Sequence, residues 1–192
     1  MTGKTRRKPR IQAEMLVGVS AVLIGVCALA VSLYETSLMR EEQRAAVMPL
    51  IELGRSYYLG GSETSNDEWR LSLHAENVGI GPARILDFRV YVDGVPKPTW
   101  NAAVRTLIGR DIAVEYGQST INGRTIPPDR QITMFDLHDR ELTAEIIGEF
   151  DRVDFQACFC SVFDECWTTN YSTFGATSPV ESCQRSDTSF QE

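Results

Sequence analysis

The stretch MLVGVSAVLIGVCALAVSLY, residues 15–34, contains no charged side chain. An α-helix rises about 1.5 Å per residue, so a helix of this length spans about 30 Å, the thickness of the hydrocarbon core of a bilayer. The sequence therefore predicts one transmembrane helix at residues 15–34. This helix separates a short tail, residues 1–14, from a remainder that is long enough to form a folded domain with its own core.

The charges on the two sides of this stretch predict its orientation. The tail has one acidic residue, Glu14, and several basic residues, which are Lys4, Arg6, Arg7, Lys8 and Arg10. Short segments rich in Lys and Arg remain in the cytoplasm. We therefore expect a cytoplasmic tail and a C-terminal part that is periplasmic or extracellular. Because the basic residues lie directly against an apolar stretch, membrane topology explains them better than a nucleic-acid-binding arm.

A cleaved signal peptide is the alternative to a retained anchor. Ala28-Leu29-Ala30 resembles the A-x-A site at which signal peptides are cleaved. The apolar stretch continues past this site to Tyr34, so it is longer than the apolar part of a usual signal peptide. No Gly or Pro between Ser32 and Met48 would end the helix. These features favour the retained anchor and leave cleavage after Ala30 open.

Small residues recur every three or four positions within the predicted transmembrane helix and form one stripe on its surface. They are Gly18, Ala21, Gly25, Ala28 and Ser32. Small side chains let two helices in a membrane approach closely, and this close packing drives their association. The stripe is therefore a candidate surface for a homodimer, although Gly is also common in membrane helices in general.

The residues after the apolar stretch predict a further helical segment and then strands. Residues 35–49 are rich in helix formers up to Pro49, and they predict a juxtamembrane helix. From residue 50 the apolar pattern changes to a period of two, which is typical of half-buried strands. The expected strands are 50–59 (with Ile51, Leu53 and Tyr57 on one side), 69–76, 86–92 (with Leu86, Phe88, Val90 and Val92 on one side), 112–116, 131–137 and 152–162.

The segments between these strands carry sequence signals for turns and short helices. Asp93-Gly94 predicts a tight hairpin turn, and Gly79 and Gly81 predict a turn with positive φ angles. The segment TWNAAVRTLIG, residues 99–109, predicts a short amphipathic helix that is capped by Thr99 and ended by Gly109. A second helical segment is expected within residues 139–149.

Together these elements predict a mainly β fold, in which the transmembrane helix is followed by an antiparallel β-sandwich of the Ig-like type with one or two short helices. The sandwich is expected to cover residues 50–172. Residues 173–192 are rich in Ser, Thr and Gln, and they are expected to form a polar, loosely held tail that is tethered at Cys183.

The most specific chemical feature of the chain is the set of cysteines that follow the apolar stretch. They are Cys158, Cys160, Cys166 and Cys183. An even number of cysteines in an oxidising compartment predicts two disulfide bonds. A bridge between Cys158 and Cys160 would be strained, because residues two apart on a strand lie near the upper limit of the Cα separation. We prefer Cys160 with Cys166 and Cys158 with Cys183, and the close alternative is Cys158 with Cys166 and Cys160 with Cys183.

Two chemical roles compete with structural disulfides. Cys158 and Cys160 could form a redox-active dithiol, or could bind a soft metal such as zinc or copper(I) together with a third cysteine. The spacing of the cysteines matches no familiar zinc site, and no Lys or His lies close in sequence to favour a thiolate. The sequence therefore favours structural bridges and predicts no cofactor.

The sequence contains no catalytic constellation, and we expect no enzymatic activity. One of the two histidines, His138, is flanked by Asp136 and Asp139, an arrangement that is more often a solvated turn than a metal or acid/base site. Of the 26 acidic and 19 basic residues, only Glu14 and the five bases of the tail precede the apolar stretch, so the rest has a net charge of −11. This charge disfavours a nucleic-acid partner.

Three segments carry a resemblance that covers most of the chain: REEQRAAVMP (40–49), ENVGIGPARI (76–85) and ACFCSVFDECW (157–167). With these segments, a basic tail and a single apolar span, the chain resembles a group of uncharacterised bacterial envelope proteins. The resemblance implies an anchor in the bacterial inner (cytoplasmic) membrane and a β-rich outer domain, and it implies no activity. The function expected is therefore that of a membrane-anchored binding or accessory module with an unidentified envelope protein as its partner.

Overall fold

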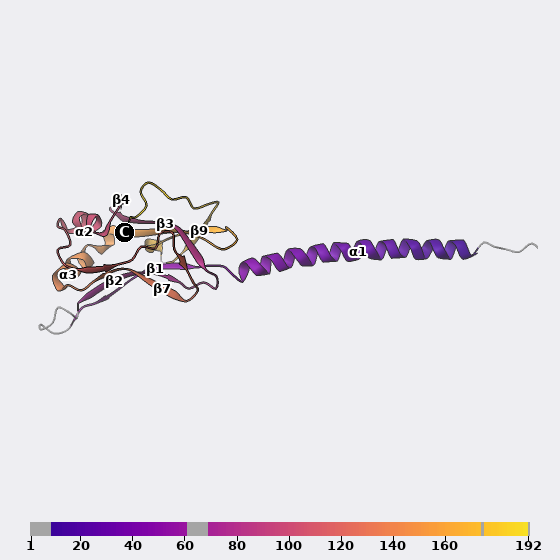
Figure 1. Cartoon of the computed structure of the whole chain (residues 1–192), viewed down its shortest axis with the longest axis horizontal. Coiled ribbons are helices and arrows are strands. Elements are labelled where there is room, and N and C mark those ends of the chain that lie inside the picture. The colour runs from indigo at the N-terminus through magenta and orange to yellow at the C-terminus, as the bar shows by residue number, and fades with distance from the viewer. Residues whose placement is uncertain (1–8, 61–68, 174, 192) are drawn as a thin grey trace, which may run out of the picture. The chain divides into compact units, whose positions relative to one another are not determined.

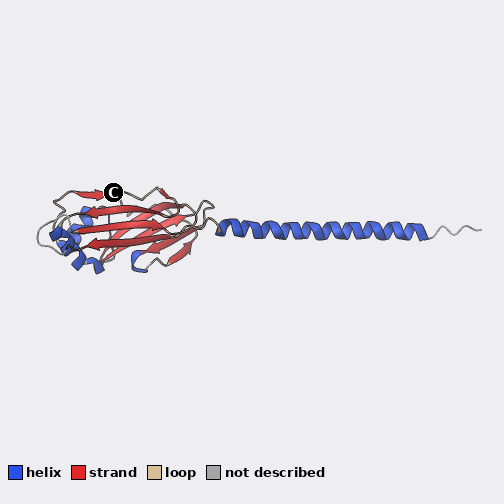
Figure 2. Cartoon of the chain, turned by 90° about the horizontal axis from the view of Figure 1, so that it is seen from below, coloured by secondary structure: helices blue, strands red, loops and turns tan. Residues whose placement is uncertain are grey.

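The computed structural model describes residues 9–60, 69–173 and 175–191. The chain forms two compact units, which are residues 1–45 and residues 46–192. Among the described residues, the first unit contains a single helix and the second contains all of the strands (Figures 1 and 2). The fold is therefore mainly β with a long N-terminal helix.

The helix of the first unit, α1 (Pro9–Ala45), is continuous over 37 residues. Every side chain from Glu14 to Ala45 is exposed, including the whole apolar stretch. Within the described residues, α1 is the one helix that is long and apolar enough to cross a bilayer, and a signal sequence near the N-terminus can also meet this criterion. The helix does not break at residue 34, and it ends at Ala45 rather than at the expected residue 49.

Two antiparallel sheets build the second unit. The order of strands is β1-β2-β7-β5 in the first sheet and β10-β9-β8-β3-β4 in the second, where β6 also pairs with β3. The strands are β1 (Ile51–Tyr58), β2 (Arg70–Asn77), β3 (Ala83–Val92), β4 (Val95–Lys97), β5 (Tyr116–Gln118), β6 (Thr125–Ile126), β7 (Arg130–Leu137), β8 (Val153–Cys160), β9 (Cys166–Asn170) and β10 (Thr177–Val180). The helices are α2 (Trp100–Ile108) and α3 (Arg140–Gly148), with 3-10 turns at Phe150–Arg152 and Tyr171–Thr173.

The core lies between the two sheets and is closed at one end by α2 and α3 (Figure 1). The aromatic rings at its centre are Phe88, Trp100, Phe135, Phe150, Phe155 and Phe190. Trp100 of α2 contacts rings from both sheets, because its centroid lies 5.1 Å from that of Phe135 and 6.1 Å from that of Phe155. The sheets and α2 therefore share a single core.

Local sequence signals gave several elements correctly. Thr99 caps α2 by accepting a hydrogen bond from the N–H of Ala102, and Gly109 ends the helix at a φ of 77°. Asp93 and Gly94 both have positive φ angles and join β3 to β4 as the expected hairpin. These signals act within a few residues, so they do not depend on the rest of the fold.

Tyr57 lies on the same side of β1 as Ile51 and Leu53, and its side chain is half exposed. Three expectations about the strands were wrong in detail. The pairing of β3 with β8 shifts register between Ile85 and Asp87, so Ala83 and Ile85 are buried before the shift, and Leu86 is not on the buried side with Phe88, Val90 and Val92. The fifth strand is β5 at Tyr116–Gln118, which is later than the expected 112–116. The strand expected at 152–162 ends at Cys160, because Ser161–Glu165 forms the turn to β9.

Candidate functional site

Strand β8 carries two of the four bridged cysteines on one of its faces. Phe155, Ala157 and Phe159 alternate along β8 and are fully buried in the core. Side chains alternate between the two faces of a strand, so Cys158 and Cys160 lie on the opposite, outer face of the sheet. The alternation that builds the core therefore also brings the two cysteines together.

Both cysteines form disulfide bonds in the structure. Cys160 of β8 is bonded to Cys166, the residue directly opposite it on β9, at a Cα separation of 4.0 Å. Cys158 is bonded to Cys183, at a Cα separation of 5.6 Å. This is the pairing that the sequence analysis preferred, and it closes one short hairpin and one loop of 25 residues.

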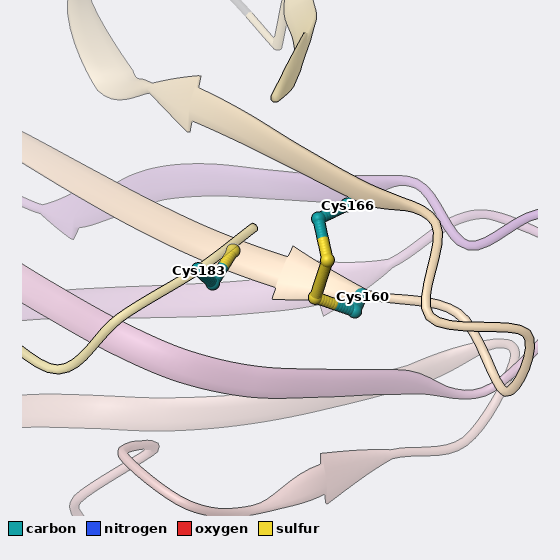
Figure 3. A group of neighbouring side chains, drawn as sticks. All are labelled: Cys160, Cys166 and Cys183. Atoms are coloured by element: carbon teal, nitrogen blue, oxygen red, sulfur yellow. A yellow bond between two sulfur atoms is a disulfide. The ribbon is translucent and has the colours of Figure 1, made fainter. Parts of the chain in front are cut away.

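The two bridges lie against each other. The sulfur atoms of Cys160, Cys166 and Cys183 are all within 4.8 Å of one another, and Figure 3 shows Cys183 beside the Cys160–Cys166 bond. Three thiolates at this separation would suit a soft metal ion, but all three sulfurs are held in disulfides here. A metal could bind only after both bridges were reduced.

Cys183 belongs to a segment that crosses the outer face of this sheet. We call residues 181–191 the C-terminal strap. The strap is bonded to β8 through Cys158, and the next strand, β3, holds it through Asp87, which accepts hydrogen bonds from Ser189 Oγ and from the Ser186 N–H. Asp87 is the register partner of Cys158, so the two attachment points are side by side.

The strap ends with its aromatic ring in the core. The Phe190 side chain is 1 % exposed, and its N–H donates a 2.8 Å hydrogen bond to the carbonyl of Phe88. Asn122 Nδ2 donates to the Phe190 carbonyl at 2.6 Å, and the Asn122 side-chain oxygen accepts from the Phe88 N–H. The expectation of a loosely held tail is therefore wrong, because residues 177–180 form β10 and Phe190 completes the core.

The ENVGIGPARI segment clamps the residues that enter the domain from α1. The side-chain oxygen of Asn77 accepts hydrogen bonds from the N–H groups of Leu50 and Gly79, and its amide donates to the carbonyls of Gly81 and Ile126. The N–H groups of Ile80 and Gly81 both donate to the carbonyl of Met48. Asn77 is fully buried, and all four of its bonds hold chain segments together.

Gly79 and Gly81 do not have the positive φ angles that the sequence analysis expected. Their role is close approach instead. A Cβ atom on Gly81 would lie 1.8 Å from the carbonyl oxygen of Val47, and one on Gly79 would lie 2.3 Å from the nitrogen of Leu50. The two glycines are needed because the backbone of residues 47–50 passes directly over them.

His138 is paired with Asp136. Its Nε2 lies 3.3 Å from Asp136 Oδ2, and Asp136 Oδ1 accepts hydrogen bonds from Arg70 Nε at 2.7 Å and from Ser72 Oγ at 2.5 Å. Burial by itself raises the pKa of Asp136, but the bonds from Arg70, Ser72 and His138 outweigh it and hold that pKa below its ordinary value. Asp139 is engaged elsewhere, since it caps α3. The Ser72 hydroxyl donates to the Asp136 carboxylate and not to the His138 imidazole, which differs from the serine–histidine contact of an activated nucleophile.

Among the residues that the structure describes, neither the core cavity nor the groove between α2 and α3 presents an unpaired charged side chain. The apolar cavity in the core has a volume of about 30 Å³, which is too small for an organic ligand. A groove of about 700 Å³ opens between α2 and α3. Its two arginines are paired, Arg110 with Glu141 and Glu145, and Arg152 with Asp93 and Glu149.

Exposed apolar side chains gather at one end of the domain, a feature that the sequence analysis missed. Register places the turns around residues 48, 80 and 163 at the same end, because Ile51 pairs with Asn77 and Arg84 pairs with Cys160. The exposed side chains in these turns are Met48, Val78, Ile80, Val162 and Phe163. We call this set the apolar end. It could not be found from the sequence because its residues come from three separate turns.

The candidate association stripe of α1 is fully exposed. Gly18, Ala21, Gly25, Ala28 and Ser32 have exposed side chains, and nothing lies within 4 Å of a Cβ added at Gly18 or Gly25. Cys27, on the same helix, is the one free cysteine of the described residues.

The amino-acid sequence matches no protein-family description and shows no significant similarity to a curated protein. The account of function therefore depends on the contacts, exposure and charges described above.

Proposed function

We propose that this chain is a membrane-anchored, extracytoplasmic binding or accessory module of the bacterial inner membrane that works within an envelope complex. The observation that carries the proposal is α1, whose charge-free residues 15–34 are all exposed and lead into a disulfide-bonded β domain. An exposed apolar helix of this length is stable in a bilayer and not in water. Disulfide bonds persist in oxidising compartments, which supports a domain outside the cytoplasm.

We further propose that the two sheets form an Ig-like sandwich. In that fold the strands, lettered in chain order, form one sheet with the order A-B-E-D and a second sheet with C, F and G. The order β1-β2-β7-β5 fits the first arrangement, and β3, β8 and β9 fit C, F and G as neighbours in the second. On this assignment the bridges join F to G and F to the strap, instead of joining the two sheets.

A binding role is supported by the apolar end. Soluble domains seldom expose a cluster of large apolar side chains unless the cluster contacts a partner. The charged groups near His138 and in the α2–α3 groove are already paired with each other, which argues against catalysis at either place. The partner expected at the apolar end is another protein of the envelope.

Thiol chemistry is the second candidate function, and a specific observation favours it. Three sulfur atoms of two different bridges lie within 4.8 Å of one another, which is an arrangement that permits exchange between them. This role would use Cys158 and Cys160 together with their bonded partners.

The anchor is tested by placing charges in the middle of α1. Each Arg at the centre of a membrane helix costs about 2.5 to 3.5 kcal/mol, so Leu23→Arg with Val26→Arg should release the chain from carbonate-washed membranes. The matched control is Leu38→Arg with Met39→Arg, which lies on the same helix beyond residue 34 and should leave the chain in the membrane. A wild-type chain that washes off, or a mature N-terminus at Val31, would contradict the proposal.

A further inference from the structure

The two disulfide bonds differ in their access to solvent. Cys160 is 1 % exposed and Cys166 is 7 % exposed, so this bridge is covered. Cys158 and Cys183 are both partly exposed. A thiolate that approaches from solvent therefore meets the Cys158–Cys183 bond first.

The strap keeps Cys183 in place on both sides of the bond. On one side, β10 pairs with β9 up to Val180. On the other side, Ser186 and Ser189 donate hydrogen bonds to Asp87, and Phe190 is buried. Opening of the Cys158–Cys183 bond would leave these contacts intact, so the Cys183 sulfur would remain beside the second bridge at a high effective concentration.

We propose that the two bridges form a thiol–disulfide exchange site, which accepts two electrons from a protein or small molecule that carries a dithiol. This inference rests on thiol chemistry, the second candidate function above, and not on the binding function. The site comprises Cys158 and Cys183 as the exposed bridge and Cys160 and Cys166 as the covered bridge.

The exchange proceeds in three balanced steps. A thiolate of the dithiol attacks the Cys158 sulfur, so that a mixed disulfide forms and the Cys158–Cys183 bond breaks, and its electron pair leaves on the Cys183 sulfur. The Cys183 thiolate then attacks one sulfur of the Cys160–Cys166 bridge, and the other sulfur leaves as a thiolate. The second thiol of the donor finally attacks the mixed disulfide and releases Cys158.

The net result is one oxidised donor and a chain that has one disulfide and two thiols. The two protons of the donor are transferred to the two released cysteine sulfurs. Between the first and second steps the strap is held by its hydrogen bonds to Asp87 and by Phe190, and after the second step it is bonded to the sheet through Cys160 or Cys166 instead of Cys158. Reduction would thus move the attachment point of the strap without releasing it.

A single substitution isolates the central step without any reductant. In Cys158→Ser, Cys183 has no native partner and its thiol faces the Cys160–Cys166 bridge. The full chain is incubated in detergent at about pH 8, where about a quarter of ordinary cysteine thiols are ionised. We expect the one free thiol of the domain to become distributed between Cys183 and the covered pair. Acid stops exchange, and pepsin digestion with mass spectrometry then locates the remaining disulfide.

The matched control is Cys183→Ser, in which the free thiol is Cys158. The Cys158 sulfur does not belong to the group that lies within 4.8 Å, so its thiol should stay at Cys158. The proposal is overturned if Cys158→Ser keeps an intact Cys160–Cys166 bridge and its free thiol remains entirely at Cys183.

The wild-type chain supplies a test that needs no variant. One molar equivalent of dithiothreitol should give molecules in which Cys183 is bonded to Cys160 or Cys166. Recovery of partly reduced molecules with free Cys158 and Cys183 and an untouched Cys160–Cys166 bond would show two independent bridges and would contradict the exchange site.

Discussion

The ring of Phe190 in the strap lies edge-on against the indole of Trp100 in α2, with a centroid distance of 4.7 Å. A segment that looks like a polar tail in the sequence thus contributes an aromatic side chain to the centre of the core. The contact joins the strap to the helix that closes the core, so the strap is part of the folded domain.

Removal of this ring should destabilise the domain strongly. Truncation of a fully buried Phe leaves a cavity and typically costs about 3 to 5 kcal/mol, so Phe190→Ala should lower the free energy of unfolding by about that amount. Phe163→Ala removes the same side chain from a half-exposed position, and it should change stability by less than about 0.5 kcal/mol. Denaturant unfolding followed by Trp fluorescence measures both. An effect of Phe190→Ala as small as that expected for Phe163→Ala would show that the strap does not contribute to the core.

The clamp over residues 47–50 should not tolerate a side chain at Gly81. The added Cβ would overlap the Val47 carbonyl, which has to move, and overpacking of this kind costs about 1 to 3 kcal/mol. Hydrogen exchange should accelerate at the N–H groups of Ile80 and Gly81 in Gly81→Ala. Gly148→Ala is the control, since nothing lies within 4 Å of a Cβ there and its φ is ordinary. Unchanged exchange in Gly81→Ala would count against the clamp.

The Asp136 cluster should make stability depend on pH below about pH 4. The pKa of Asp136 in the folded domain is below its ordinary value of 3.8, so the ionised form is favoured by folding. This contribution is fully present above the unfolded pKa and is lost as the pH falls through the folded pKa. Asp136→Asn should lower the free energy of unfolding by on the order of 1 kcal/mol at neutral pH, as expected for a partly exposed pair. Its free energy of unfolding should also depend less on pH below about pH 4. Asp151→Asn, an exposed control, should retain the wild-type profile; the same loss of pH dependence there would refute the assignment.

The stripe on α1 gives a prediction for association. A large side chain at Gly25 would keep two helices apart, and it meets nothing within a single chain. Gly25→Ile should therefore abolish crosslinked dimers in membranes, whereas Leu23→Ile, on the opposite face of the helix, should preserve them. Dimers that persist in Gly25→Ile would show that the stripe is not the interface.

Features that depend on a few neighbouring residues could be predicted from the sequence. The limits of α2, its caps at Thr99 and Gly109, and the Asp93-Gly94 hairpin follow from backbone preferences that act locally. The alternation of apolar residues likewise predicted the strand that forms β8. The preferred disulfide pairing agrees with the structure because the turn at Ser161–Glu165 places Cys160 opposite Cys166.

Features that depend on distant parts of the chain could not be predicted. Gly79 was assigned a positive φ because a turn is the commonest reason for a glycine, but the real constraint is the backbone of Leu50, which is far away in sequence. Phe190 is a single aromatic residue in a polar segment, so no periodicity marks it as buried. The apolar end and the Asp136 cluster are assembled from separate turns and strands, and only the register of the sheets brings them together.

The central claim is that a disulfide-bonded domain lies outside the cytoplasm on a membrane anchor. It is tested most directly by labelling intact bacterial cells with a membrane-impermeant maleimide, in a Cys27→Ala chain whose remaining cysteines are all bridged. The outer membrane of the cells is made permeable while the inner membrane stays intact. A membrane-impermeant phosphine serves as the reductant. The account predicts no labelling before reduction and labelling of Cys158, Cys160, Cys166 and Cys183 from outside the inner membrane after it. Labelling that requires lysis of the inner membrane, or that occurs without reduction, would contradict the account.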